Sequence, residues 1–165
     1  MSSDAIVVLK EDHKKVKRLF REFERAGENT QRKQELVGEI IAELTVHTYL
    51  ENEIMYPLVR QFLPDLEDDV LESYEEHHVV DVLALELLEL DPSNEHFDAK
   101  TTVLIENVRH HVEEEETDWF PKVRAGMSRK DLLDIGAQIE LMRPSAPRDP
   151  RDPKAMASAL KAITA

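Results

Sequence analysis

The sequence predicts an all-α protein: an up-down-up-down four-helix bundle followed by a fifth, C-terminal helix and a proline-rich tail. Three observations carry this prediction. Only 4 of the 165 residues are glycine, whereas leucine, glutamate, lysine and alanine, which favour helices, are abundant. Apolar residues recur with a helical period over four long segments. Short connections separate these segments, as in an antiparallel bundle.

The first two helices are predicted from their apolar stripes and from residues that start or stop a helix. The segment Asp4–Ala26 has apolar residues at helical spacing and is followed by Gly27, which favours a helix end. A second helix is expected from about Thr30 to Phe62. Pro57 lies inside it and should kink or end it locally, because proline lacks an N–H and clashes with the preceding turn.

The third to fifth helices are predicted in the same way. The third runs from about Asp65 to Leu90, and the sequence DPSN at 91–94 indicates a turn. The fourth is expected over Glu95–Ala125. Ser128 then opens a sequence that resembles a capping box, so a fifth helix should extend from there to about Arg143.

One globular domain is therefore expected over residues 1–143, the bundle plus an accessory helix. Residues 144–153, PSAPRDPRDP, contain four prolines and predict an extended polar linker that is not packed against the bundle. Residues 154–165 can form a short amphipathic helix or a frayed tail, and the sequence does not decide between them.

Composition excludes several classes of function. The chain carries 35 acidic and 21 basic residues, a net charge of −14, which would repel nucleic acid and an anionic membrane surface. Cysteine is absent, so disulfides, thiolate metal sites and a cysteine nucleophile are excluded. No signal peptide is visible, and no uncharged stretch approaches the ~18 residues of a membrane span. We expect a soluble cytoplasmic protein.

An internal repeat with an offset of 64 residues selects six polar side chains as candidate metal ligands. It places His13 over His77, His47 over His111 and Glu51 over Glu115. Each half of the bundle then looks like one helical hairpin, with a histidine on its first helix and a His-x-x-x-Glu motif on its second. All six residues fall on apolar stripes, so they should converge in one buried layer.

The repeat also resolves two pairs of adjacent histidines. His77 and His78 are neighbours, as are His110 and His111. Neighbours on a helix point ~100° apart, so only one of each pair can face the core. The repeat selects His77 and His111, and the other two should flank the core or face solvent.

Six such ligands in one layer predict two metal ions. Buried carboxylates need a proton, a cation or strong hydrogen bonds to offset their charge. Nitrogen and carboxylate ligands without sulfur suit iron, manganese or zinc, and six of them exceed a four-coordinate zinc site. By the symmetry of the repeat, each ion takes one histidine pair and both glutamates are shared, which leaves coordination positions open for a small ligand.

The pattern His13 … His47-x-x-x-Glu51 … His77 … His111-x-x-x-Glu115, with LKEDHKKV, ENEIMYP and HHVEEEETDWFPKV around it, resembles the hemerythrin-like HHE cation-binding family over residues 4–125. The resemblance implies a non-haem centre of two oxo- or hydroxo-bridged iron ions that binds or reacts with O₂, hydrogen peroxide or NO. Oxygen carriers of this superfamily have a fifth histidine one turn from the helix-three ligand. Here Ser73 and Asp81 flank His77 at that distance, which speaks against reversible oxygen carriage.

Two functions remain open at this point. The first is oxidative or nitrosative stress handling by a di-iron redox enzyme whose ligand is peroxide or a small diatomic. The second is a sensor or store that binds O₂ or iron without turnover. A purely structural zinc site fits less well, because it would leave ligands and open positions unexplained. The sequence indicates no protein partner.

Several neighbouring residues have alternative interpretations. Met55 and Trp119 should form an apolar layer beside the metals. Asp118 can accept a hydrogen bond from a ligand histidine, although a solvated position is the simpler expectation. The remaining residues considered are the solvated helix-four glutamates Glu113, Glu114 and Glu116, and the tyrosines Tyr49, Tyr56 and Tyr74, none of which is favoured as a phenolate ligand.

Overall fold

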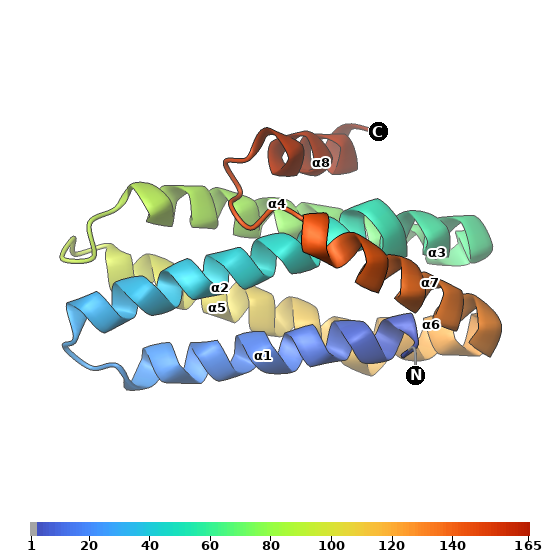
Figure 1. The fold of residues 1–165 in the computed structure, drawn as a ribbon, viewed down its shortest axis with the longest axis horizontal. Helices are drawn as coiled ribbons and strands as arrows, with labels where there is room; N and C mark the ends of the chain where they lie inside the picture. Colours follow the sequence, from blue (N-terminus) through green and yellow to red (C-terminus); the bar gives the residue numbers. More distant parts are fainter. Residues whose placement is uncertain (1–2) are drawn as a thin grey trace.

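Two helical hairpins form the bundle in the computed structural model, which describes residues 3–165 (Figure 1). The first hairpin consists of α1 (Ala5–Arg25) and α2 (Thr30–Leu50). The second consists of α4 (Glu67–Glu89) and α5 (Phe97–Glu114). Residues 3–165 contain no strand, so the predicted all-α bundle is confirmed. Within the same residues, no helix combines the length and the apolar character that crossing a membrane requires.

The second helix of each hairpin passes through one π-helical turn and then continues. In the first hairpin, η1 (Glu51–Met55) leads into α3 (Tyr56–Phe62). In the second, η3 (Glu115–Trp119) leads into α6 (Phe120–Gly126). The two π turns stand 64 residues apart, as the sequence repeat does. A short 3₁₀ turn, η2 (Pro64–Leu66), connects α3 to α4.

The local disturbance that Pro57 predicts takes the form of this π turn. Within η1, the backbone N–H of Tyr56 donates to the carbonyl of Glu51, five residues earlier. A proline ring clashes with the carbonyl four residues before it in a regular helix. The wider turn that precedes Pro57 relieves this clash, so the helix runs on to Phe62.

Polar side chains cap the helices where the sequence changes direction. Asp4 accepts a hydrogen bond from the backbone N–H of Val7 at the start of α1. Ser128 accepts one from Asp131 at the start of α7 (Arg129–Met142), as the capping-box sequence predicts. Gly27, with φ of +60°, turns the chain after α1 in the left-handed region that glycine tolerates best.

The C-terminal segment packs against the bundle more closely than its composition predicts. After α7 come the 3₁₀ turn η4 (Arg143–Ser145) and the helix α8 (Pro153–Thr164), which lies against α4 (Figure 1). Between them Pro147 and Pro150 are buried, and Arg148 pairs with Glu43 of α2 at 3.1 Å. The expectation of an unpacked linker is therefore wrong, and Pro153–Thr164 form a helix rather than a frayed tail.

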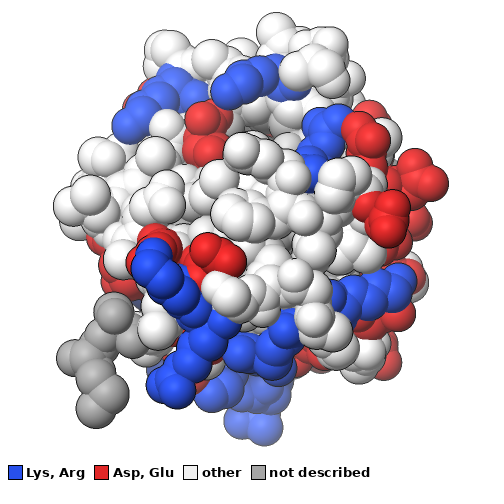
Figure 2. Space-filling model, turned by 90° about the vertical axis from the view of Figure 1, so that its right-hand side faces the viewer, with Lys and Arg blue, Asp and Glu red and all other residues white. Residues whose placement is uncertain are grey.

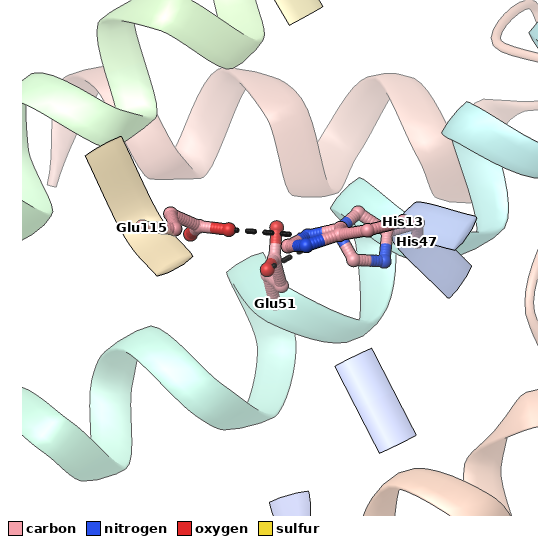
Figure 3. A group of neighbouring side chains, drawn as sticks. All are labelled: His13, His47, Glu51 and Glu115. Atoms are coloured by element: carbon pink, nitrogen blue, oxygen red, sulfur yellow. Dashed lines mark ion pairs between the residues drawn. The ribbon is translucent and has the colours of Figure 1, made fainter. Parts of the chain in front are cut away.

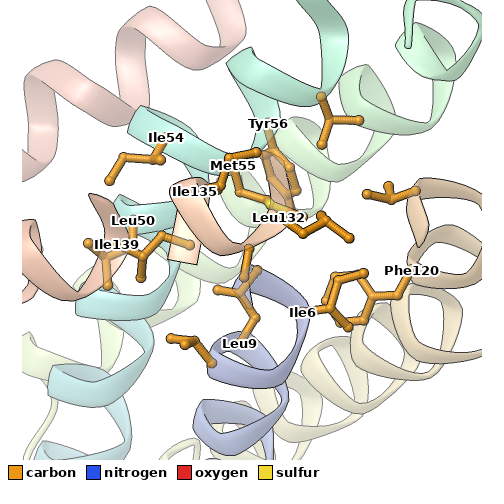
Figure 4. Close-up of a cluster of buried hydrophobic side chains, with 14 of the residues drawn as sticks. Ile6, Leu9, Leu50, Ile54, Met55, Tyr56, Phe120, Leu132, Ile135 and Ile139 are labelled. Carbon is orange, nitrogen blue, oxygen red and sulfur yellow. The ribbon is translucent and has the colours of Figure 1, made fainter. Parts of the chain in front are cut away.

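Two apolar clusters fill the interior and leave a polar layer between them. The first lies among α1, the end of α2, η1, α3, the start of α4, η3, α6 and α7, and its members include Ile6, Leu9, Leu50, Met55, Tyr56, Phe120 and Leu132 (Figure 4). The second lies nearer the α1–α2 connection, and its members include Val16, Phe20, Leu36, Leu44, Val80 and Leu104. Figure 2 looks onto the end formed by α3, α6 and α7, where charged side chains surround an uncharged area. The two apolar clusters thus cover the polar layer on both sides along the bundle axis.

The contact between α7 and the start of α1 predicts opposite effects for two glycine substitutions. A Cβ added at Gly136 would lie 2.2 Å from the Ser3 carbonyl oxygen and 2.9 Å from the Ala5 nitrogen, which are backbone atoms. We therefore expect Gly136→Ala to lower the free energy of unfolding by about 1–3 kcal/mol. Urea denaturation checks this value.

The matched control is Gly38→Ala in α2, where an added Cβ meets nothing within 4 Å. Alanine favours a helix over glycine by ~0.5–1 kcal/mol, so this variant should be more stable than the parent. Equal effects of the two substitutions would contradict the close packing of α7 on α1.

Candidate metal centre

Each of the four bundle helices contributes one buried histidine to the layer between the apolar clusters. They are His13 of α1, His47 of α2, His77 of α4 and His111 of α5, each at most 7% exposed. Glu51 and Glu115, the first residues of the two π turns, are 0% and 2% exposed and lie in the same layer. The structure thus brings together all six side chains that the repeat selects.

The register argument for the adjacent histidines is confirmed by burial. His77 is 2% exposed and His111 is 7% exposed, whereas their neighbours His78 and His110 lie on the surface. His110 pairs with Glu114 on the outside of α5 at 3.2 Å. In both pairs, the histidine at the repeated position is therefore the one that reaches the interior.

Each of the two glutamates faces one histidine from each half of the bundle. Glu51 places Oε1 3.2 Å from His47 Nε2 and Oε2 3.2 Å from His77 Nε2. Glu115 places Oε2 3.3 Å from His13 Nε2 and Oε1 3.5 Å from His111 Nε2. Figure 3 shows the pairing of Glu51 with His47 and of Glu115 with His13. A carboxylate that offers one oxygen to each histidine pair has the arrangement that bridging of two cations requires.

The opposite ring nitrogen of every histidine in the layer donates to an acidic or amide oxygen. The pairs are His13 with Glu116 at 2.8 Å, His47 with Asp12 at 3.0 Å, His77 with Asn52 at 2.9 Å, and His111 with Glu76. Because Nδ1 is the donor, Nε2 carries the free lone pair of the neutral ring and faces the centre of the layer. Oriented imidazoles of this kind are typical of metal ligands.

These four acceptors were not predicted, although the repeat contains them. Asp12 and Glu76 are 64 residues apart, and so are Asn52 and Glu116. Glu116, expected on the solvated face of helix four, is only 27% exposed and bonds to His13. Asp118 is 61% exposed and pairs with Lys122, in agreement with the simpler expectation of a solvated position. The 64-residue repeat therefore extends to the acceptor positions, although Asn52 and Glu116 differ in residue type.

Tyr56 is the other residue of the layer that sequence reasoning did not single out. Its hydroxyl donates to Glu115 Oε1 at 2.7 Å and lies 3.2 Å from Glu51 Oε2. It also lies 3.2 Å and 3.4 Å from the Nε2 atoms of His77 and His111. In a regular helix the residue five after Glu51 points elsewhere, but the five-residue hydrogen bond of the π turn brings Tyr56 over Glu51.

The repeat is broken at this position, because the counterpart of Tyr56 is Phe120. The Phe120 ring stacks on His13 at 5.8 Å between centroids and offers no hydroxyl. Trp119 is buried, and its ring packs edge-on against Tyr56 at 5.3 Å. Together with the fully buried Met55, Trp119 belongs to the apolar cluster beside the layer, as the sequence predicts.

The residues of the layer fit metal cations. Among the described residues six buried side-chain atoms lack a hydrogen-bond partner, and four of them belong to the layer, namely His13 Nε2, His47 Nε2, Glu51 Oε1 and Glu115 Oε2. Leaving buried polar atoms unpaired costs ~1–3 kcal/mol each, and a cation among them removes that cost. These four residues also form one of two buried groups whose donor atoms lie within 4.8 Å of one another; the other group is Glu51, His77 and His111.

Charges within the layer show what a cation would replace. Burial alone would lower the pKa of His111, but Glu115, Glu76 and Glu51 beside it outweigh burial and raise its pKa to about 9. Burial would likewise raise the pKa of Glu51, yet His47 and His77 hold it well below its usual range. In the metal-free layer Glu51 therefore stays charged and His111 holds a proton at neutral pH, and metal binding must displace that proton.

A small apolar cavity adjoins the layer on the side of the second apolar cluster. Its volume is about 20 Å³, which is room for a molecule about the size of water. All four histidines of the layer line it, together with Val16, Leu44, Val80, Val108 and Val112. Access to the histidines from this side is therefore limited to very small molecules.

Comparison with known proteins agrees with this geometry. The profile of a family described as Hemerythrin HHE cation binding domain matches residues 4–123. A protein named DNA nickase from Nostoc sp. is 34% identical over 121 residues, which are 73% of this chain and 34% of that protein. This chain thus spans about a third of that relative. The crystal structure of a hemerythrin HHE cation binding domain-containing protein from Mycobacterium kansasii superposes with a TM-score of 0.72, at 24% identity, over 97% of this chain and 99% of that one.

The two shared glutamates predict unequal effects of removing single ligands. Glu115→Ala removes an oxygen from both histidine pairs, whereas His13→Ala removes a donor from one pair only. We expect metal content near zero for Glu115→Ala and partial for His13→Ala, measured by elemental analysis after loading and gel filtration. Equal metal content in the two variants would contradict the bridging role.

The hydrogen bonds of the Tyr56 hydroxyl predict that this group stabilises the metal-free protein. In metal-free protein it donates to buried carboxylates, so Tyr56→Phe should lower the free energy of unfolding by ~1.5–3 kcal/mol, the usual range for a hydrogen bond to a charged group. Urea denaturation in the presence of a chelator measures this. Tyr49→Phe is the control, because it also removes a phenolic hydroxyl but does so at a ring that lies against α8, with its centroid 5.3 Å from Lys154 Nζ. A similar loss in both variants would exclude a specific role for the Tyr56 hydroxyl.

Proposed function

Because the chain belongs to the hemerythrin HHE cation-binding domain family, we propose that its buried histidine and glutamate layer holds two iron ions that react with a small oxidant. The observation that carries this proposal is the pair of carboxylates that each face both histidine pairs. A single four-coordinate zinc ion would leave several of these donors unused. A nitrogen and oxygen donor set without sulfur suits iron.

The size of the space beside the histidines supports a small oxidant. The apolar cavity of about 20 Å³ has room beside the histidines for a molecule of the size of O₂, NO or hydrogen peroxide. Bound iron supplies electrons and open coordination positions to such a molecule. The protein contributes a dry, apolar wall on one side of the layer and a hydroxyl donor, Tyr56, within it.

Reaction is favoured over reversible oxygen carriage by the residues around His77. One helical turn to either side lie Ser73, whose hydroxyl bonds to the Asp69 carbonyl, and Asp81, which lines a separate cavity under α8. Neither adds an imidazole that would saturate the centre. Tyr56, by contrast, places a hydroxyl beside both histidines of this half. A hydrogen-bond donor within the layer supports binding of an oxidant that gains negative charge as it is reduced.

The name of the Nostoc relative does not extend this proposal to DNA cleavage. This chain matches only about a third of that protein, so the named activity can belong to its other parts. The net charge of −14 also opposes approach to a phosphate backbone. We therefore propose a small-molecule ligand and no nucleic-acid partner.

Iron-loaded protein tests the proposed function directly. Metal-free protein is loaded anaerobically with two equivalents of ferrous iron and then exposed to hydrogen peroxide, O₂ or NO. We expect a coloured ferric product, followed by visible absorption, and continued peroxide consumption under steady-state conditions. Zinc-loaded protein is the control and should remain colourless and inactive.

Two other outcomes would change the conclusion. A coloured protein that consumes no oxidant beyond the first equivalent would indicate the binding module without turnover, a sensor or store. Protein that retains zinc and fails to retain iron would contradict the di-iron proposal.

A further inference from the structure

A surface cavity leads to the buried layer from the side of the bundle, between α4 and η3. Its volume is about 300 Å³, and His111 and Glu115 of the layer line its inner part. The remaining walls carry five more acidic side chains, namely Asp69, Glu72, Glu76, Glu114 and Asp118. This cavity connects solvent with the candidate ligands through polar surroundings, unlike the apolar clusters that cover the layer along the bundle axis.

The charge of this cavity attracts cations. Six carboxylates line it, and Lys122 compensates only the outer ones, at 2.7 Å from Asp118 and 3.5 Å from Asp69. A cleft lined by one sign of charge concentrates ions of the opposite sign and accelerates their capture. A hydrated divalent ion cannot cross an apolar cluster without losing its water, so the acidic cavity is the favoured route to the layer.

A group of metal-type ligands lies beside the cavity, outside the layer. Glu76, His110 and Glu114 each offer one donor atom, and these atoms lie within 4.8 Å of one another. His110 and Glu114 are exposed, at 67% and 51%, and their Nε2 and Oε1 atoms are 3.2 Å apart. One imidazole and two carboxylates form a donor set that suits a divalent transition-metal ion with water completing its coordination.

Glu76 joins this surface group to the buried layer. Its Oε2 accepts a hydrogen bond from His111 Nδ1, and its side chain is 24% exposed. At the inner part of the same cavity, Glu115 is 2% exposed and its Oε2 lacks a hydrogen-bond partner. The cavity therefore has exposed ligands beside it and a buried carboxylate of the candidate centre farther in.

We propose that Glu76, His110 and Glu114 form an uptake site that captures a divalent cation from solvent and passes it along the acidic cavity to His111 and Glu115. This inference rests on the proposed function, because it needs a metal centre to be filled. The uptake site holds its ion weakly and in exchange with solvent, whereas the buried layer holds its ions firmly. Removing the uptake site should slow filling of the layer without changing its final content.

Cobalt uptake by the full metal-free chain tests the proposal. Samples mixed with Co²⁺ are stopped with a chelator at timed intervals, and the retained cobalt is measured after gel filtration. The test variant is His110→Gln with Glu114→Gln. The control is Glu95→Gln with His96→Gln, an exposed glutamate and histidine pair at 3.7 Å on another part of the surface, which removes the same groups.

We expect about tenfold slower uptake in the test variant at low ionic strength, an effect of the size that electrostatic capture gives. The control should load at the parental rate, and both should reach the parental cobalt content. In cobalt-loaded protein, titration with Mn²⁺ followed by electron paramagnetic resonance should show one additional weak site, absent only from the test variant.

Three results would overturn the uptake site. Equal uptake rates in the test and control variants would exclude its kinetic role. A lower final cobalt content in the test variant, with an unchanged circular dichroism spectrum, would make these residues part of the centre itself. A parent protein that retains no cobalt would contradict the buried metal centre first, and the uptake site with it.

Discussion

The burial of two carboxylates in the middle of the bundle is the constraint on which the rest of this structure depends. Glu51 and Glu115 are almost inaccessible to solvent, and each must find positive partners or donors within the protein. Four imidazoles and one phenol supply those partners, and four further acceptors hold the imidazoles in position. The apolar clusters on either side then shield the layer from water along the bundle axis.

The π turns explain how a helix can present this much chemistry at one level. Each begins at the glutamate of a His-x-x-x-Glu motif and is followed by a proline in the next helix. The motif brings a histidine and a glutamate onto one face, and the wider turn adds the residue five positions later. In the first half that residue is Tyr56, so a single helix contributes three side chains to the layer.

Most of the fold and all six candidate ligands could be predicted from the sequence, because both depend on periodicity. Helical spacing defines the faces of the bundle, and the 64-residue offset separates His77 and His111 from their neighbours. Tyr56 could not be predicted on that basis, because a π turn departs from the helical period. The packing of residues 144–153 was missed for another reason: proline content describes the backbone and says nothing of tertiary burial.

The candidate centre is asymmetric, because Phe120 in the second half stands where the first half has Tyr56. On one side of the layer the Tyr56 hydroxyl lies beside His77 and His111, whereas on the other side the hydrocarbon ring of Phe120 stacks on His13. A hydroxyl can donate a hydrogen bond to a polar or charged group beside it, and a hydrocarbon ring cannot. Two hairpins related by one repeat therefore give the two histidine pairs unlike surroundings, and any pair of cations held there would occupy inequivalent positions.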